Sequence, residues 1–195
     1  HMDTIPIILA SASPRRLAIL RALGVRAEVR RPHCLEVTLR DDPAGTVGVN
    51  ARRKALSVRA SHPNAAIIAA DTVVCFEGRV LGKPRSTEEA RAWLTAYAGK
   101  TQTVYTAVAL LYPGAQEPSL RIEATSLQFK NYDARTVEAY LALARPLDRA
   151  GAYDVNVRGD LLIAGRVGSF TNAMGLPRGV VRDWLASHGL LGAER

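Results

Sequence analysis

An apolar run in the middle of the chain, residues 65–74, constrains the fold more than any other stretch of the sequence. Its sequence is AAIIAADTVV, with small and β-branched residues on what would be both faces of a strand. Strands that are apolar on both faces lie in the centre of a sheet, where neighbouring layers cover both sides. The run therefore predicts a buried central strand.

Asp71 is the one charged residue in this run. A carboxylate buried in a sheet costs several kcal/mol unless it is paired, protonated or bound to a cation. The strand alone favours an ion pair with a nearby arginine and a functional role about equally. Asp71 is therefore a candidate site residue whose role depends on what the rest of the chain brings near it.

A second stretch, residues 7–16 (IILASASPRR), joins an apolar strand to the start of a helix. Pro14 presets φ for the first helical turn, and Ser13 stands at the N-cap position. The free N–H groups and the positive end of the helix dipole then face the same place as Arg15 and Arg16. The stretch predicts an anion site suited to a phosphate group, although an isolated match of this kind more often marks a plain strand, turn and helix.

The remaining pattern mixes helices and strands. Residues 41–44 (DDPA) predict the start of a helix that runs to about Ala60 and carries Lys54. Glu77-Gly78-Arg79 predicts a hairpin turn, and its return strand would deliver Lys83 to the Asp71 end of the sheet. The same reasoning predicts helices over residues 86–98, 134–143 and up to 187, and strands over residues 103–112, 119–129 and 161–167.

The 195 residues, 48% of them hydrophobic, can bury a core in one or two lobes without disulfides or a metal. His1 and Met2 resemble a cloning remnant, so a single domain over residues 3–195 is expected. We expect no signal peptide, and no apolar run approaches the ~20 residues of a membrane span. Cys34 and Cys75 lack metal-ligand spacing and are expected to be reduced thiols of a cytoplasmic protein.

The net charge of +8 favours polyanionic partners, which include nucleotides, nucleic acids and acidic surfaces. Aromatic residues make up only 6% of the chain and do not alternate with basic ones, so a groove for single-stranded nucleic acid is the weaker interpretation. We therefore expect a nucleotide as the partner, with no stable nucleic-acid complex and no membrane association.

Six short motifs, in this order, resemble the Maf family of nucleoside triphosphate pyrophosphatases, which were once described as septum-formation inhibitors. They are residues 11–16 (SASPRR), 51–55 (ARRKA), 70–74 (ADTVV), 81–84 (LGKP), 150–153 (AGAY) and 175–177 (GLP). The resemblance runs from about Ile7 to Leu185. It implies an α/β fold with a mixed twisted sheet and flanking helices, in two lobes around a central cleft as in the ITPase-like proteins, and a homodimer.

The resemblance also implies hydrolysis of a nucleoside triphosphate between the α and β phosphates, with Mg²⁺ or Mn²⁺ as the divalent cation. Asp71 would be the proton acceptor, Lys83 and Glu36 would be further catalytic residues, and Asp71 and Glu36 would hold the metal. Arg15 and Thr72 fall at positions that the family uses for substrate choice. The substrate-binding residues implied in this way are Ser11, Ser13, Arg15, Arg16, Lys54, Thr72, Arg149 and Asn156.

The chemistry of these residue types agrees with that reaction. Phosphoryl transfer requires little covalent work from a protein, but it requires charge to be neutralised and a water to be placed in line. The arginines and lysines of this set can neutralise phosphates, and Asp71 and Glu36 can hold Mg²⁺ or orient the water. The two carboxylates come from separate segments, so their meeting at one cation is a hypothesis that the structure can test.

Four positions depart from the family pattern, the fourth being Arg145, which replaces an acidic residue in the same loop as Arg149. The dTTP/UTP-cleaving branch has a Gly-Ile-Gln-Gly run where this chain has residues 154–157 (DVNV), so Asn156 is one methylene shorter than the Gln. Gln102 stands for a His and cannot carry a proton at neutral pH, and Arg149 stands for a Lys.

The favoured function is therefore nucleotide house-cleaning, with dTTP and UTP as the first expectation. A methylated guanine nucleotide, the substrate of a sister branch, is an alternative. A second alternative is a catalytically weakened nucleotide- or nucleic-acid-binding regulator of cell division, which would show salt-sensitive affinity and no phosphate chemistry.

Overall fold

The apolar run around Asp71 forms β3 (Ala66–Phe76), the central strand of the computed structural model, which describes residues 4–192. β1 (Ile7–Ala10) pairs with β3 in parallel, and β5 (Thr101–Leu111) pairs with it antiparallel on the other side. The first five residues of β3 have no exposed surface. The predicted central strand is confirmed, and its burial on both faces explains its apolar composition.

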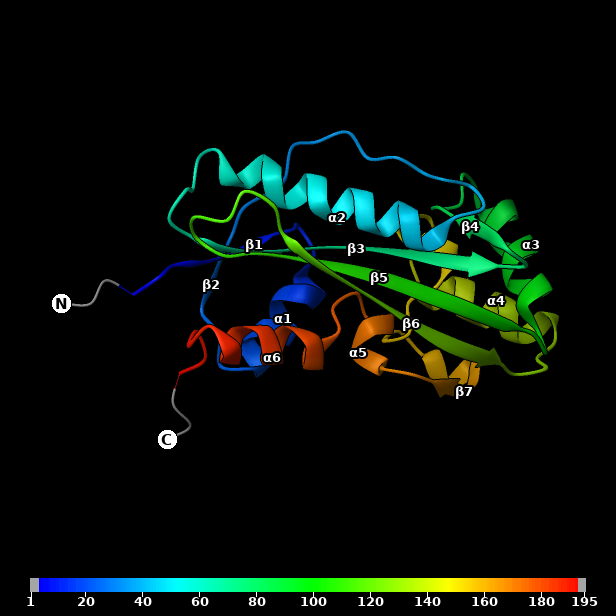
Figure 1. Cartoon of the computed structure of the whole chain (residues 1–195). Helices are drawn as coiled ribbons and strands as arrows, with labels where there is room; N and C mark the ends of the chain where they lie inside the picture. The colour runs from blue at the N-terminus through cyan, green and yellow to red at the C-terminus, as the bar shows by residue number, and fades with distance from the viewer. Residues whose placement is uncertain (1–3, 193–195) are drawn as a thin grey trace.

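The sheet extends outward on both sides of these three strands (Figure 1). β2 (Ala27–Val29) lies beyond β1, while β6 (Ser119–Phe129) and β7 (Ile163–Val167) follow β5. β4 (Arg79–Leu81) forms the predicted hairpin with the end of β3 through a turn that includes Gly78. The described residues thus form a mixed seven-stranded sheet with the order β2-β1-β3-β5-β6-β7 and with β4 attached to β3.

Helices cover both faces of the sheet's first part (Figure 1). α2 (Pro43–Arg59) packs on one face, against residues such as Ile67. α1 (Pro14–Ala22) and α6 (Arg178–Ser187) pack on the other face, against residues such as Ile68. Consecutive strand residues point to opposite faces, so β3 contributes to both cores.

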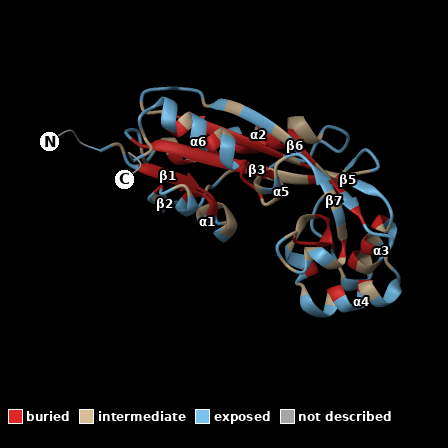
Figure 2. Ribbon diagram, turned by 90° about the horizontal axis from the view of Figure 1, so that it is seen from below, coloured by how far each residue is buried: buried red, intermediate tan, exposed pale blue. Residues whose placement is uncertain are grey.

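A third core builds a second lobe at the other end of β3 and β5 (Figure 2). There α3 (Thr87–Tyr97) and α4 (Ala134–Leu143) contact each other and pack around Val74 of β3. A short helix, α5 (Phe170–Ala173), follows β7. Asp71 lies between the part of β3 that belongs to the first two cores and the part that belongs to the third, and so at the junction of the two lobes.

Local signals predicted most element boundaries. Asp42 and Ser86 accept hydrogen bonds from backbone N–H groups in the first turns of α2 and α3, as the sequence predicts. The strand predicted from residue 161 begins only at Ile163, because residues 159–161 form a 3-10 turn after Arg158, whose φ is +47°.

Three further expectations concern the chain as a whole. Cys34 and Cys75 are free thiols. Within residues 4–192, no helix has the length and apolar character needed to cross a membrane. The suspected cloning remnant, His1 and Met2, lies outside the described residues.

Candidate active site

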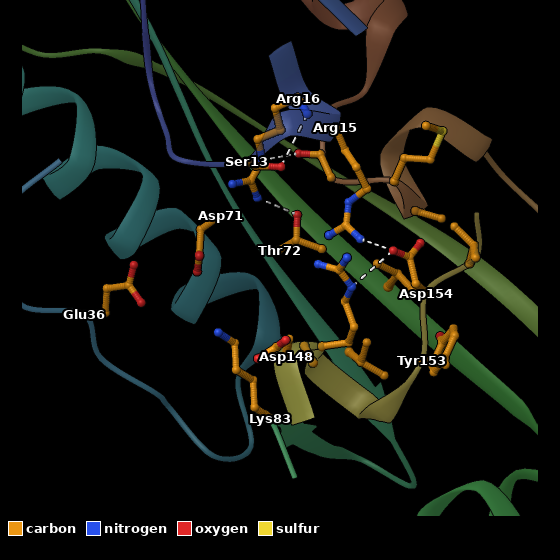
Figure 3. Close-up of a pocket in the computed structure, with 18 of the residues that line it drawn as sticks. Ser13, Arg15, Arg16, Glu36, Asp71, Thr72, Lys83, Asp148, Tyr153 and Asp154 are labelled. Atoms are coloured by element: carbon orange, nitrogen blue, oxygen red, sulfur yellow. Dashed lines mark hydrogen bonds and ion pairs between the residues drawn. The ribbon is translucent and has the colours of Figure 1, made fainter. Parts of the chain in front are cut away.

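A cavity of about 370 Å³ lies at the junction of the two lobes, beside Asp71 and Thr72 of β3 (Figure 3). Segments far apart in the sequence line it, from the start of α1 to the turn before α6. All the residues predicted for the site are among its lining except Ser11 and Asn156. The members that line it are Ser13, Arg15, Arg16, Glu36, Lys54, Asp71, Thr72, Lys83 and Arg149.

Lys54 of α2 joins the two predicted carboxylates. Its Nζ lies 2.9 Å from Asp71 Oδ1 and 2.8 Å from Glu36 Oε1. The Lys54 and Asp71 side chains are 11% and 12% exposed, whereas Glu36, on the irregular segment before α2, is 56% exposed. The two carboxylates therefore share one cation, which here is an ammonium group.

Asn50 also holds the Asp71 carboxylate and the segment before α2 in place, and it was not among the residues predicted from the sequence. Its Nδ2 donates to Asp71 Oδ2 at 3.0 Å and to the Val37 carbonyl at 2.8 Å, while its Oδ1 accepts from the Val37 N–H at 2.9 Å. Asn50 thus holds both the Asp71 carboxylate and the segment that carries Glu36. Its spacing of four residues from Lys54 places both side chains on one face of α2, and this spacing is the signal that could have identified it.

The start of α1 has the predicted N-cap. Ser13 Oγ accepts from the Arg16 N–H at 3.4 Å, and Pro14 occupies the first helical position. Ser11 lies behind this turn, where its Oγ accepts from the Ser13 N–H at 3.0 Å and from Arg16 Nη1 at 3.3 Å. Ser11 is 5% exposed and shapes the turn without lining the cavity.

The Arg16 guanidinium holds three segments together at the cavity wall. Its Nε donates to the Gly175 carbonyl at 2.7 Å, and its Nη2 donates to Thr72 Oγ1 at 3.0 Å. Thr72 Oγ1 in turn lies 2.8 Å from Thr106 Oγ1 on β5. Burial lowers the pKa of Arg16 to about 10, while the nearby Asp71 carboxylate opposes that shift. Arg16 therefore holds the cavity wall together and also contributes a positive charge to it.

Asp154 forms a second charged group in the cavity, and the sequence reasoning did not select it. Its Oδ2 lies 2.6 Å from Arg15 Nη1 and 3.1 Å from Arg149 Nε. Its side chain is only 5% exposed. An acidic residue in a segment that departs from the family pattern, close in sequence to Arg149, is the signal that could have identified it.

The side chain of Asn156 does not enter the cavity. The Asn156 N–H donates to Asp154 Oδ1 at 2.9 Å, and residues 155–158 then turn, leaving Asn156 exposed. Gln102, the second departure, is 1% exposed and lies outside the lining. Arg149, the third, does line the cavity.

Lys83 follows β4 and lines the cavity with an exposed side chain. Among residues 4–192, no carboxylate lies within ion-pair distance of its ammonium group. In Figure 3, Glu36, Asp71 and Lys83 lie toward one side of the view, and Asp154 and Tyr153 lie toward the other. The positive charge of Lys83 is therefore available to an anionic ligand.

The residues that could hold a metal are Asp71 and Glu36. Within the described part of the chain, no group of three or more His, Cys, Asp or Glu side chains could hold an ion by itself. Mg²⁺ commonly takes one or two protein carboxylates and completes its shell with water and substrate phosphates. Two carboxylates that already converge on one cation fit an ion of this kind.

Comparisons with known proteins identify relatives over almost the whole chain. The family model described as Maf-like protein matches residues 6–188. The dTTP/UTP pyrophosphatase of Moorella thermoacetica is 40% identical over 185 residues, which cover 94% of this chain and 95% of that protein. The dTTP/UTP pyrophosphatase of Myxococcus xanthus is 40% identical over 191 residues, which cover 97% of this chain and 96% of that protein.

Among solved structures, the Staphylococcus aureus Ham1 protein has a similar fold. It superposes with a TM-score of 0.52 at 12% sequence identity, over 94% of this chain and 99% of that chain. At this identity the likeness concerns the fold alone. It agrees with the mixed α/β architecture expected from the sequence.

Proposed function

The chain belongs to the Maf-like protein family, and on this premise we propose that it is a nucleoside triphosphate pyrophosphatase acting on dTTP and UTP. The reaction is hydrolysis of the α–β phosphoanhydride to a nucleoside monophosphate and pyrophosphate. The names of the relatives support the substrate. The observation that carries the proposal is the placement of Arg16, Lys54 and Lys83 around the nearly buried Asp71 carboxylate in one cavity.

The cations of this cavity suit a triphosphate chain. The ammonium group of Lys83 has no ion-pair partner among residues 4–192, and Lys54 can exchange part of its contact with the exposed Glu36 for a phosphate oxygen. Arg16 holds the wall in place and adds a third positive charge. Positive charge that is already in position when the substrate binds lowers the energy of the transition state without reorganisation at that moment.

Asp71 is proposed to accept the proton of the attacking water. Lys54 and Asn50 each hold one of its oxygens, so the carboxylate has a fixed orientation toward the cavity. The water oxygen forms a bond to the α phosphorus, its proton goes to Asp71, and the bond between that phosphorus and the bridging oxygen breaks. Pyrophosphate leaves with the electron pair, and Lys83 stabilises its added negative charge.

The divalent cation belongs to the same proposal. When bound, Mg²⁺ or Mn²⁺ would supply positive charge that neutralises the phosphate oxygens. Asp71 and Glu36 would hold it, since they are the two carboxylates that converge on Lys54. Glu36 is the more exposed of the two and can turn toward the phosphates without losing a buried position.

The base is proposed to lie at the Arg15 and Tyr153 end of the cavity. Tyr153 lines this end and is 6% exposed, and its ring packs edge-on against Phe129 at a centroid distance of 5.3 Å. A ring held in this way can bound one side of a nucleobase. This placement leaves the triphosphate to the cations around Asp71.

A nucleotide panel tests the proposal. Wild-type protein with Mg²⁺ or Mn²⁺ should release pyrophosphate from dTTP and UTP faster than from other triphosphates. Asp71→Asn should lower kcat by about 100-fold or more, because it removes the proton acceptor. Its nucleotide affinity should be kept or increased, since one fewer negative charge faces the triphosphate.

Asp183→Asn is the control, because Asp183 is an exposed carboxylate of α6 outside the cavity, with an 80% exposed side chain. Its kcat should equal that of the wild type. Absence of pyrophosphate release from every triphosphate, or full turnover by Asp71→Asn, would contradict the proposal. Salt-sensitive DNA or RNA binding without any hydrolysis would favour the alternative function, a nucleic-acid-binding regulator of cell division.

A further inference from the structure

Asp154 is a nearly buried carboxylate on the cavity wall that the proposed reaction does not use. Its Oδ2 contacts Arg15 Nη1 at 2.6 Å and Arg149 Nε at 3.1 Å. The Tyr140 hydroxyl accepts from the Asp154 N–H at 2.8 Å and donates to its carbonyl at 3.2 Å. Both the carboxylate and its backbone are therefore fixed.

The contact between Arg15 and Asp154 connects the two lobes. Arg15 is the second residue of α1, which packs in the first lobe. Asp154 directly follows Tyr153, which belongs to the core of the second lobe. The ion pair thus spans the cavity between segments 139 residues apart and sets how the Arg15 guanidinium lies in it.

Asp154 also changes the charge of its end of the cavity. Without it, Arg15 and Arg149 would present two guanidinium groups with no carboxylate between them, and these could compete for the phosphates. With the carboxylate between them, one of the two positive charges is neutralised. Each end then keeps about one net positive charge, and a divalent cation held by Asp71 and Glu36 would add two more at the Lys54 and Lys83 end, so the triphosphate would be drawn there.

The two guanidinium groups keep N–H donors that Asp154 does not use. Arg15 and Arg149 are 35% and 39% exposed in their side chains, so these donors can reach a ligand. A guanidinium donates hydrogen bonds and accepts none. A base edge that faces it must therefore supply an acceptor, as the C4 carbonyl oxygen of uracil and thymine does, whereas the C4 amino group of cytosine would place a donor against a donor.

We propose that Asp154 is a specificity-determining residue that fixes Arg15 and Arg149 as readers of the C4 carbonyl of uracil or thymine and reduces their attraction for phosphate. It acts through the two arginines and is thus a positioning residue. The inference rests on the proposed function for the class of ligand, a nucleoside triphosphate.

Binding of three ligands tests this role without requiring turnover. Calorimetry with Mg²⁺ compares α,β-methylene-UTP, α,β-methylene-CTP and inorganic triphosphate on wild type and Asp154→Asn. The wild type should bind the UTP analogue more tightly than the CTP analogue. Asp154→Asn should bind inorganic triphosphate about tenfold more tightly and should lose about tenfold of its preference for UTP over CTP.

Two further variants separate charge, position and folding. Asp154→Glu keeps the charge but moves the carboxylate, so it should lose the UTP preference while inorganic triphosphate binds as in the wild type. Asp160→Asn is the matched control, because Asp160 pairs with Arg158 at 2.9 Å on the same segment but is exposed and outside the cavity. It should leave all three affinities unchanged.

An unchanged UTP preference in both Asp154 variants would overturn the inference. An equal loss of affinity for all three ligands in the Asp154 variants would also overturn it, because that result shows only a structural role. The proposed function fails by a different result, namely no pyrophosphate release from UTP by a wild type that binds the UTP analogue. In that case the three affinities still decide the role of Asp154.

Discussion

The lysines and arginines of the cavity differ in how many protein partners they have, and this difference separates their roles. The Arg16 guanidinium donates to Ser11, Thr72 and Gly175, and the Lys54 ammonium group binds two carboxylates. Side chains held in this way are placed before a substrate arrives. A free cation such as Lys83 gains its main partner only when the substrate binds.

Replacement of Lys83 tests this distinction. Lys83→Met should change the free energy of unfolding by no more than about 0.5 kcal/mol, since it breaks no ion pair in the described structure. It should lower kcat/KM for UTP by about 100-fold, because the positive charge that pairs with the phosphates when the substrate binds is lost. Steady-state kinetics and chemical denaturation measure the two effects.

Lys100→Met is the control for this substitution. Lys100 is a half-exposed lysine that pairs with Glu77 at 2.9 Å outside the cavity, so its loss should leave kcat/KM unchanged. Equal activity of Lys83→Met and Lys100→Met would show that Lys83 does not contribute to substrate binding or catalysis.

The sequence predicted single residues well where their local surroundings restrict their role. Asp71 was identified because a carboxylate in an apolar strand requires a partner, and Ser13 because a hydroxyl before Pro14 suits an N-cap. Asp154 and Asn156 lie in an irregular segment, where side-chain directions depend on distant partners. The Asp154 partner Arg15 is 139 residues away, and no local pattern encodes that contact.

Among the elements, the turn before α6 shows how the site depends on a particular backbone conformation. Gly175 has a φ of +113°, and its carbonyl accepts from Arg16 Nε at 2.7 Å. A Cβ at Gly175 would lie 3.4 Å from that nitrogen. The GLP motif of the sequence thus contains a glycine because the turn must approach Arg16 closely in a conformation that other residues rarely adopt.

Alanine substitutions at two glycines test this requirement. Gly175→Ala should lower the free energy of unfolding by about 1–3 kcal/mol, because its backbone conformation is strained for alanine. It should also lower kcat, since Arg16 must shift. Denaturant unfolding and the pyrophosphate assay give both values.

Gly179→Ala is the matched control four residues later. Gly179 lies inside α6, and a Cβ there would meet no atom within 4 Å. This variant should be more stable than the wild type by about 0.5 kcal/mol, because alanine favours a helix. Loss of stability in both variants to the same extent would contradict the account of the turn.

Element boundaries were predictable to the extent that caps and turns specify them. The caps of α2 and α3 and the hairpin between β3 and β4 follow from two or three residues each. The start of β7 was not predictable in this way, because the preceding 3-10 turn depends on a positive φ at Arg158, a residue type that rarely adopts it.

At the scale of the whole molecule, the second lobe contains a group of buried phenol side chains. Burial raises the pKa of Tyr140 to about 12, and it also raises the pKa values of Tyr97, Tyr132 and Tyr153 above the ordinary value of 10. Between pH 10 and pH 12 the unfolded chain therefore binds fewer protons than the folded one. Stability should fall as the pH rises through this window.

Denaturant midpoints at neutral pH and between pH 10 and pH 12 measure this loss. Tyr153→Phe is an informative variant, because the buried Tyr153 hydroxyl has no hydrogen-bond partner among the described residues. Removal of this hydroxyl should reduce the pH dependence of the denaturant midpoint without breaking a hydrogen bond. A midpoint that is constant across the window would show that these tyrosines do not keep their protons in the folded lobe.

The two lobes position the site because β3 and β5 belong to both of them. The residue patterns predicted a buried central strand with further strands and helices around it, and the resemblance to the Maf family added the mixed sheet and the two lobes around a cleft. The width of the cavity and the contact between Arg15 and Asp154 depend on how α1 and residues 148–155 meet across it. Such long-range packing is not encoded in any one segment.

The most direct test of the central claim is the fate of the attacking oxygen when UTP is hydrolysed with Mg²⁺ in ¹⁸O-labelled water. A water placed beside Asp71 and directed at the α phosphorus predicts that mass spectrometry finds one ¹⁸O atom in UMP and none in pyrophosphate. Label in pyrophosphate, or formation of UDP and orthophosphate, would contradict the account.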